Sequence, residues 1–115
     1  MKEGAILNAV ITSASIGDDD HGGMSSFVFV EFEGGGCGFG GYRLFSPNDS
    51  RERGNYSGVW LWRVMQIAGV SSWNMLPGKT IRVKIGPETI AAIGHIIKDD
   101  WFDPKATFEQ MRNAK

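Results

Sequence analysis

The chain has 115 residues, 42% of them hydrophobic and 22% charged, which predicts one globular domain over residues 1–115 and argues against a disordered or fibrous chain. Lys and Arg number 12 against 13 Asp and Glu, and a net charge of -1 makes duplex nucleic acid an unfavourable partner. The single cysteine, Cys37, cannot form an internal disulfide, and no apolar stretch approaches the roughly 20 residues of a bilayer span. We therefore expect a cytoplasmic protein without a membrane segment.

Three strands are predicted in the first part of the chain. Residues 5–16 are rich in Ile, Val, Thr and Ser, and residues 26–33 alternate a Phe-containing side with a Val-containing side. The polar segment 17–23 between them predicts a turn, so these two strands should form a hairpin. Residues 37–45 predict a third strand, which is short and interrupted by glycines.

A helix is predicted from about Asn55 or Ser57 to Ala68, because Asn and Ser cap free amides at a helix start and Gly69 suits a helix end. Apolar side chains surround the axis of this helix, whereas a surface helix would keep a polar face. We therefore expect it to be buried on nearly all sides. A small sheet covers only one flank, so the other flank predicts contact with a second copy and a homo-oligomer.

The last third of the chain predicts a second hairpin, with strands at 80–85 and 90–98, and a short final helix that Asp103 caps. His95 then shares a strand face with Ile93 and Ile97, which favours a hydrogen-bonded core histidine. The resulting order, β-β-β-α-β-β-α, predicts an α+β fold with a small antiparallel sheet, one central buried helix and a short C-terminal helix.

Six glycines lie within residues 34–41. Gly36, Gly38 and Gly41 match the letters of a dinucleotide-binding turn, but no helix follows and no acidic residue lies about twenty positions further on. Closely spaced glycines can still let a backbone approach a ligand and offer amides to phosphate oxygens. A ligand loop and a purely structural bulge are both open interpretations of this stretch.

Trp101 and Phe102, close in sequence to His95 and Lys98, form an aromatic and basic cluster of the kind that stacks on bases and meets phosphates. The alternative is an aromatic pair that anchors the last helix on the core. Cys37 with His95 as its base lacks any recognisable local signature, and no spacing fits a phosphate loop, a calcium loop or a zinc site. No catalytic residue, metal or cofactor is therefore predicted.

Several motifs together resemble a family of small phage and prophage proteins, the Thoeris anti-defence sponges of the first type. These motifs are residues 12–17 with Asp20-His21-Gly22, Gly38-Phe39-Gly40-Gly41-Tyr42, Trp62-Arg63-Val64-Met65, residues 69–73, Pro77-Gly78-Lys79 and residues 92–104. The resemblance implies a phage-encoded protein in the host bacterial cytoplasm that is not an enzyme. It implies binding and sequestration of a cyclic ADP-ribose isomer made by a bacterial TIR immune enzyme, or of another cyclic nucleotide. It also implies an oligomer with the pocket near a subunit boundary.

The candidate site residues rest on chemistry rather than on the resemblance. Aromatic rings would stack on a base, glycine amides and arginines would meet a pyrophosphate, and a histidine would bind a ribose or phosphate. The ligand-binding candidates are Phe39, Gly40, Gly41, Tyr42, Arg43, Arg63, Arg82, His95, Trp101 and Phe102. Two other functions stay open: a phage structural or interaction protein with no small-molecule ligand, and a single-strand nucleic-acid binder.

Overall fold

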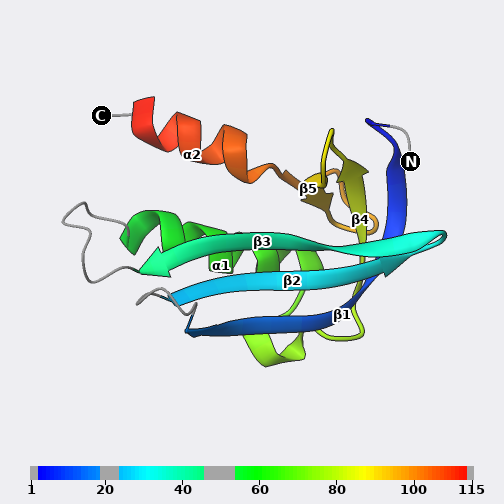
Figure 1. Cartoon of the computed structure of the whole chain (residues 1–115), viewed down its shortest axis with the longest axis horizontal. Helices are drawn as coiled ribbons and strands as arrows, with labels where there is room; N and C mark the ends of the chain where they lie inside the picture. The colour runs from blue at the N-terminus through cyan, green and yellow to red at the C-terminus, as the bar shows by residue number, and fades with distance from the viewer. Residues whose placement is uncertain (1–2, 19–23, 46–53, 114–115) are drawn as a thin grey trace.

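A computed structural model describes residues 3–18, 24–45 and 54–113 and shows a small α+β fold (Figure 1). The elements are β1 (Ile6–Asp18), β2 (Met24–Phe32), β3 (Gly35–Phe45), α1 (Gly54–Ala68), a 3-10 turn (Trp73–Met75), β4 (Thr80–Ile85), β5 (Ile90–Gly94), β6 (Trp101–Phe102) and α2 (Pro104–Asn113). The strands form one six-stranded sheet in the order β3-β2-β1-β4-β5-β6, and all neighbours are antiparallel. The predicted α+β class with an antiparallel sheet is confirmed, whereas the predicted order β-β-β-α-β-β-α lacks β6.

The sheet curls because β1 pairs with two different strands along its length. Its first part pairs with β4 and its second part with β2, and the register with β2 shifts between Ile11 and Ser13. As a result β4 and β5 run across the direction of β1, β2 and β3 (Figure 1). The curl brings the start of β5 to β3, where the Thr89 hydroxyl donates to the Gly38 carbonyl oxygen at 3.2 Å. The sheet is thus an open barrel whose β5 side approaches β3.

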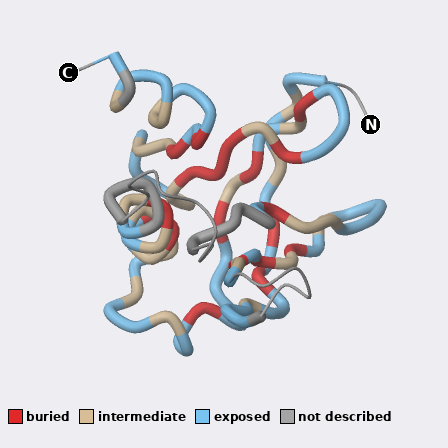
Figure 2. The backbone as a smooth tube through the Cα atoms, turned by 60° about the vertical axis from the view of Figure 1, so that its left-hand side comes forward, coloured by how far each residue is buried: buried red, intermediate tan, exposed pale blue. Residues whose placement is uncertain are grey.

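The core lies between the concave side of this sheet and α1. Trp60, Val64 and Ile67 are at most 1% exposed and pack with buried residues of the strands, Val30 and Val83 among them. Figure 2 shows the buried segments of α1 turned toward those of the strands. Spacings of four and three residues place these three side chains on one stripe of the helix.

Within one copy α1 is buried along one stripe only, and the expected burial of its other flank by a second copy stays a prediction. Trp62 is 57% exposed and Gln66 is exposed, so the helix is amphipathic in structure although it is apolar in composition. Side chains on its flanks, such as Leu61 and Met65, are half-buried. One stripe of contact with the sheet is enough to fix the helix, and the outward Trp62 needs no partner for the fold of a single copy.

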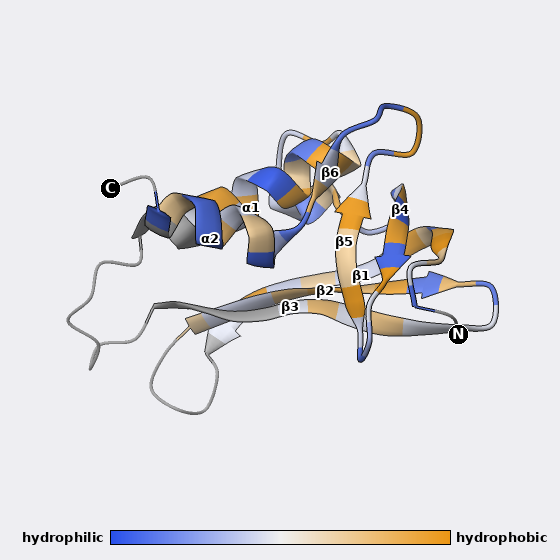
Figure 3. Ribbon diagram, turned by 90° about the horizontal axis from the view of Figure 1, so that it is seen from above, coloured by the Kyte–Doolittle hydropathy of each residue, from blue (hydrophilic) through white to orange (hydrophobic). Residues whose placement is uncertain are grey.

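The second hairpin also differs from the prediction. The strand expected over 90–98 ends at Gly94, and the chain returns as the two-residue strand β6, which pairs Trp101 with Gly94. The His95 N–H donates to the Asp100 carbonyl oxygen at 2.9 Å and closes a loop over residues 95–100. Ile97 in this loop is 85% exposed, so His95 and Ile97 do not share a core face. Figure 3 shows the loop between β5 and β6 extending away from the strands.

The start of α2 is as predicted. Pro104 opens the helix and the Asp103 carboxylate accepts a hydrogen bond from the Ala106 N–H at 3.1 Å. Pro104 is buried, and Phe108 on the same helix packs against the core. Neither of the helices that the structure describes has the length and apolar character needed to cross a membrane.

Candidate functional site

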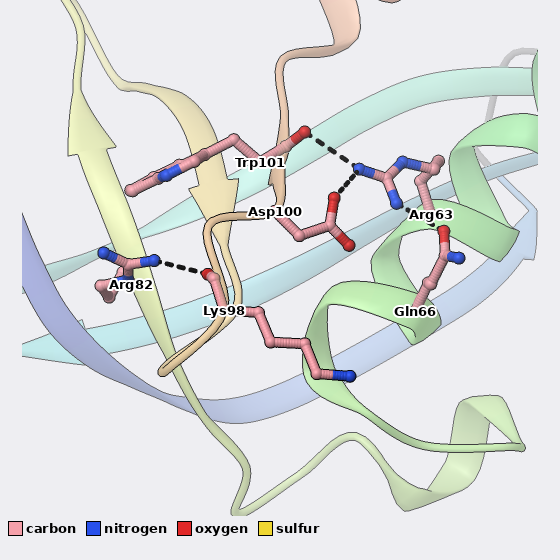
Figure 4. Close-up of polar contacts among 6 residues, drawn as sticks. All are labelled: Arg63, Gln66, Arg82, Lys98, Asp100 and Trp101. Atoms are coloured by element: carbon pink, nitrogen blue, oxygen red, sulfur yellow. Dashed lines mark hydrogen bonds and ion pairs between the residues drawn. The ribbon is translucent and has the colours of Figure 1, made fainter.

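Four of the predicted site residues meet around the loop 95–100, although they come from different elements. Figure 4 shows Arg63, Arg82 and Trp101 among them. We call Arg63, Arg82, His95 and Trp101 the aromatic–basic corner. Arg63, on α1, donates from Nη2 to the Asp100 carboxylate at 2.8 Å and to the Trp101 carbonyl oxygen at 2.9 Å. This hydrogen bond with Arg63 lowers the pKa of the Asp100 carboxyl below 3.8.

Arg82 holds the same loop from the sheet side. Its Nε donates to the His95 carbonyl oxygen and its Nη2 to the Lys98 carbonyl oxygen, both at 2.8 Å. Its guanidinium also lies 4.9 Å from the centroid of the Trp101 ring. Arg82, Gly94 and Trp101 are register partners across β4, β5 and β6, so they form one row of the sheet.

Gly94 makes this row possible. A Cβ at Gly94 would lie 2.7 Å from atoms of the Trp101 ring, so the indole covers the bare backbone of Gly94 and reaches Arg82. An aromatic ring laid across a glycine on the neighbouring strand compensates for the missing side chain. The ring of Trp101 therefore has a structural role in joining β6 to the sheet.

The imidazole of His95 completes the corner. Its Nδ1 accepts hydrogen bonds from the N–H groups of Ile97 and Lys98, at 3.1 and 3.0 Å. An accepting Nδ1 carries no proton, so the proton of the neutral ring is on Nε2. The polar groups of the corner are thus directed at the loop 95–100, and the arrangement explains how that loop is held rather than how an anion would be bound.

The two phenylalanines among the predicted residues lie in the core. Phe39 is 3% exposed and its ring stacks with Trp60 at a centroid distance of 6.2 Å. Phe102 is 1% exposed and meets Phe39 edge to face at 6.4 Å. A base cannot stack on either ring in this packing, so the predicted stacking role of Phe39 and the ligand contact of Phe102 do not fit the structure.

One glycine of β3, Gly40, serves packing. Gly40 has φ +116°, and a Cβ there would lie 2.5 Å from Cζ2 of the buried Trp60. This favours the structural interpretation for Gly40. Gly41, Tyr42 and Arg43 belong to β3, and Tyr42 and Arg43 pair with Ser26 and Ser25, but their side chains lie outside the described residues.

An exposed aromatic surface, which the sequence analysis did not select, lies on the outer side of the sheet. Phe27 is 41% exposed and Phe29 is half-buried, and both project from β2 on the side opposite Val28 and Val30. The Phe27 ring comes within 3.5 Å of a Cβ position at Gly38, and the Phe29 ring within 3.4 Å of that at Gly36. The two rings therefore lean over the glycines of β3. We call Phe27, Phe29, Gly36 and Gly38 the stacking platform.

The signal for the platform was present in the sequence as the alternation of Phe27 and Phe29 with Val28 and Val30. Alternation separates two faces of a strand but does not say which face meets the helix.

Within the described residues, no group of three or more His, Cys, Asp or Glu side chains is placed to hold a metal ion. Comparisons of the chain with protein-family models, with curated proteins and with solved structures gave no match, so the resemblance to Thoeris sponges stays a prediction.

Proposed function

We propose that the protein is a non-enzymatic nucleotide-binding domain that stacks bases on the platform of Phe27 and Phe29. The observation that carries this proposal is the pair of aromatic rings held on the outer face of the sheet over glycine backbone. Because these glycines carry no side chain, the rings can lie over the backbone of β3, and Phe27 keeps 41% of its surface exposed for contact with a flat ligand. Stacking of a base on an aromatic side chain contributes about 1 to 3 kcal/mol.

The distance between the Phe27 and Phe29 rings along β2 suits a ligand that contains nucleobases. Residues two apart on a strand lie about 6.6 to 6.8 Å apart along it, so the two rings can meet two bases of a cyclic dinucleotide, or one ring can meet the single adenine of a cyclic ADP-ribose isomer. Their neighbours on β1, Ser13 and Ser15, pair with Phe29 and Phe27 and are exposed. Their hydroxyls offer hydrogen bonds to ribose or phosphate oxygens at the side of the platform.

The location of the platform adds support. It occupies β2 and β3 of an open antiparallel barrel, and small five-stranded, partly open barrels bind oligonucleotides on the face of their second and third strands. A shared architecture does not determine function. The aromatic side chains on that face are what support nucleotides as the ligand class here.

The charge distribution favours a small ligand over a long strand. The net charge is -1, and Glu31 and Glu33 follow the platform along the chain. A long polyanion would be repelled by these carboxylates, whereas a ligand with one or two phosphates meets few of them. We therefore propose a cyclic nucleotide, such as the cyclic ADP-ribose isomer that the resemblance implies, held intact as by a phage-encoded sponge.

The test is retention and release of intact ligand. The purified protein is incubated with a panel of cyclic ADP-ribose isomers, cyclic dinucleotides and cyclic trinucleotides, and a short single-stranded oligonucleotide forms a separate arm. After desalting, the bound fraction is released by heat and identified by mass spectrometry. We expect an intact cyclic nucleotide. Release of a cleaved product would contradict a non-enzymatic function, and retention of nothing from the panel would overturn the proposal.

Variants then locate the site. Phe27→Ala and Phe29→Ala should each weaken binding about tenfold or more, because each removes a stacking surface worth about 1 to 3 kcal/mol. Trp62→Ala is the matched control, since Trp62 is an exposed aromatic residue on α1. Trp101→Ala tests the aromatic–basic corner in the same assay. Binding that survives Phe27→Ala but is lost in a folded Trp101→Ala variant would place the ligand at the corner and refute the platform.

A further inference from the structure

The carboxylate of Glu31 lies beside the stacking platform, although a negative charge there repels the phosphates of a nucleotide. We propose that Glu31 recognises the base that stacks on Phe29 and selects guanine. This inference rests on the proposed function, because it requires a base on the platform. Within the ligand class proposed above, it ranks cyclic dinucleotides that contain guanine ahead of ligands whose only base is adenine.

Glu31 and Phe29 converge on the same glycine. They lie two positions apart on β2, so both project from the outer side of the sheet, and Glu31 is the register partner of Gly36 on β3. A Cβ at Gly36 would lie 3.3 Å from Cγ of Glu31 and 3.4 Å from Cε1 of Phe29. The carboxylate is bonded to this Cγ, so it lies beside the Phe29 ring. A base that stacks on the ring therefore brings its own edge within reach of the carboxylate.

The Glu31 side chain is available for a ligand. It is exposed, and among the residues that the structure describes none forms a hydrogen bond or an ion pair with it. Glu31 also lines a shallow depression of about 450 Å³ on the outer side of the sheet. Thr12 lines the same depression, and its hydroxyl donates to the Phe29 carbonyl oxygen at 3.2 Å. The depression therefore begins next to Phe29 and leaves space for the edge of a stacked base.

The chemistry of a carboxylate distinguishes guanine from the other bases. An ionised carboxylate accepts hydrogen bonds and donates none. The Watson–Crick edge of guanine carries two adjacent N–H donors, on N1 and on the 2-amino group, which match the two carboxylate oxygens. Adenine and cytosine each present one amino group beside a ring nitrogen lone pair, which a carboxylate repels. A bidentate pair to a charged group is strong, and such pairs favour the matching base by about tenfold or more.

The same orientation keeps the phosphates away from Glu31. The sugar of guanine is attached at N9, across the ring system from N1, so a base with N1 at the carboxylate directs its sugar and phosphate away from it. A single carboxylate recognises a single base. The second base of a cyclic dinucleotide, stacked on Phe27, is therefore not selected, and one guanine per ligand is enough.

The first experiment uses the parent chain and isothermal titration calorimetry with four probes. Cyclic di-GMP and the mixed cyclic GMP–AMP should bind with similar affinity, because each supplies one guanine to Glu31. Cyclic di-AMP should bind about tenfold more weakly or worse, because it has no paired donors. Cyclic di-IMP, which lacks only the 2-amino group of guanine, should also lose about tenfold through the missing hydrogen bond to a charged group.

The second experiment changes the carboxylate to an amide. Glu31→Gln replaces one acceptor with a donor, so its side chain matches the amino group and the ring nitrogen of adenine. This variant should bind cyclic di-GMP about tenfold more weakly and cyclic di-AMP at least as tightly as cyclic di-GMP. Glu33→Gln is the matched control, since Glu33 is an exposed carboxylate that lines the same depression, and it should keep the preference for guanine.

The outcomes separate this inference from the proposed function. Equal binding of cyclic di-GMP and cyclic di-AMP by the parent, an unchanged preference in Glu31→Gln, or a lost preference in Glu33→Gln would each overturn the role of Glu31. All three would leave base stacking on Phe27 and Phe29 intact. A parent chain that binds none of the four probes and no other cyclic nucleotide would refute the proposed function itself, and this inference with it.

Discussion

Substitution of Gly40 by alanine should destabilise the protein by about 2 to 6 kcal/mol. Gly40 has φ +116°, a backbone conformation that costs a non-glycine residue about 1 to 3 kcal/mol. The new Cβ would also lie 2.5 Å from Cζ2 of Trp60 and 3.0 Å from the Ser26 carbonyl oxygen. Trp60 is 0% exposed, so its ring cannot swing away, and overpacking of this kind typically costs about 1 to 3 kcal/mol. The range of about 2 to 6 kcal/mol is the sum of the backbone cost and the overpacking cost.

Thermal unfolding followed by circular dichroism measures this effect, and a loss of 1 kcal/mol lowers the Tm of a 60–100-residue domain by roughly 4 to 8 °C. We expect a decrease on the order of 10 °C or more. The control is Gly58→Ala in α1, where a Cβ meets nothing within 4 Å and alanine should stabilise the helix by about 0.5 to 1 kcal/mol. A Gly40→Ala variant as stable as the parent would refute the packing argument and return Gly40 to the ligand-loop interpretation.

Three further predictions concern the helices and the loop they hold. Arg63 lowers the pKa of Asp100, so their ion pair stabilises the fold fully above pH 3.8 and loses its effect as the pH falls through the lower folded-state pKa. Asp100→Asn should lower the free energy of unfolding by at most about 1 kcal/mol at neutral pH, since this carboxylate is 39% exposed, and by nothing well below pH 3.8. Urea denaturation at several pH values measures this difference. Asp103→Ala should cost about 1 kcal/mol through loss of the α2 cap, which a urea titration at neutral pH will measure, and an unchanged midpoint would contradict the cap. Trp60→Glu should prevent folding whereas Trp62→Glu should leave the circular dichroism spectrum unchanged, because only Trp60 is buried.

Alternation and turn residues were sufficient to predict most of the sheet. Strand β4 begins and ends where the pattern of Ile81 and Val83 predicts, and β1 and β2 form the expected hairpin. Composition was a poorer guide to the burial of α1, because a run of apolar residues does not say how much of each side chain is covered by the rest of the protein. Trp60 and Trp62 look alike in the sequence and differ by 57 percentage points of exposure in the structure.

The end of the second hairpin was missed for a different reason. Ile96 and Ile97 continue the apolar, β-branched run of the strand before them, so a local pattern extends that strand. What ends it at Gly94 is a pairing with Trp101 and a hydrogen bond from His95 to Asp100, both of which depend on residues further along the chain. A strand as short as β6 has no periodicity of its own.

The candidate site was predictable only in part. The sequence analysis grouped His95 with Trp101 and selected Arg82 separately. These three residues do meet, but the hydrogen bonds of Arg82 and His95 hold the loop 95–100. The glycines were noticed as a group, yet each has its own neighbour: Gly40 lies against Trp60 and Gly38 lies beneath Phe27. Which side chain crosses a glycine depends on register, and register between β2 and β3 includes shifts that the sequence does not reveal.

The position of β1 also bears on how the chain folds as it is made. The first strand lies in the middle of the sheet, and its residue Ile6 pairs with Lys84. On the ribosome, β1 can form its hairpin with β2 early, but its other edge stays without a partner until β4 has emerged. Pairings between distant segments slow folding, and an unpaired strand edge invites contact with other chains in the meantime. A fusion partner or tag at the N-terminus is therefore attached next to β1, which stays without its second neighbour until β4 has been synthesised.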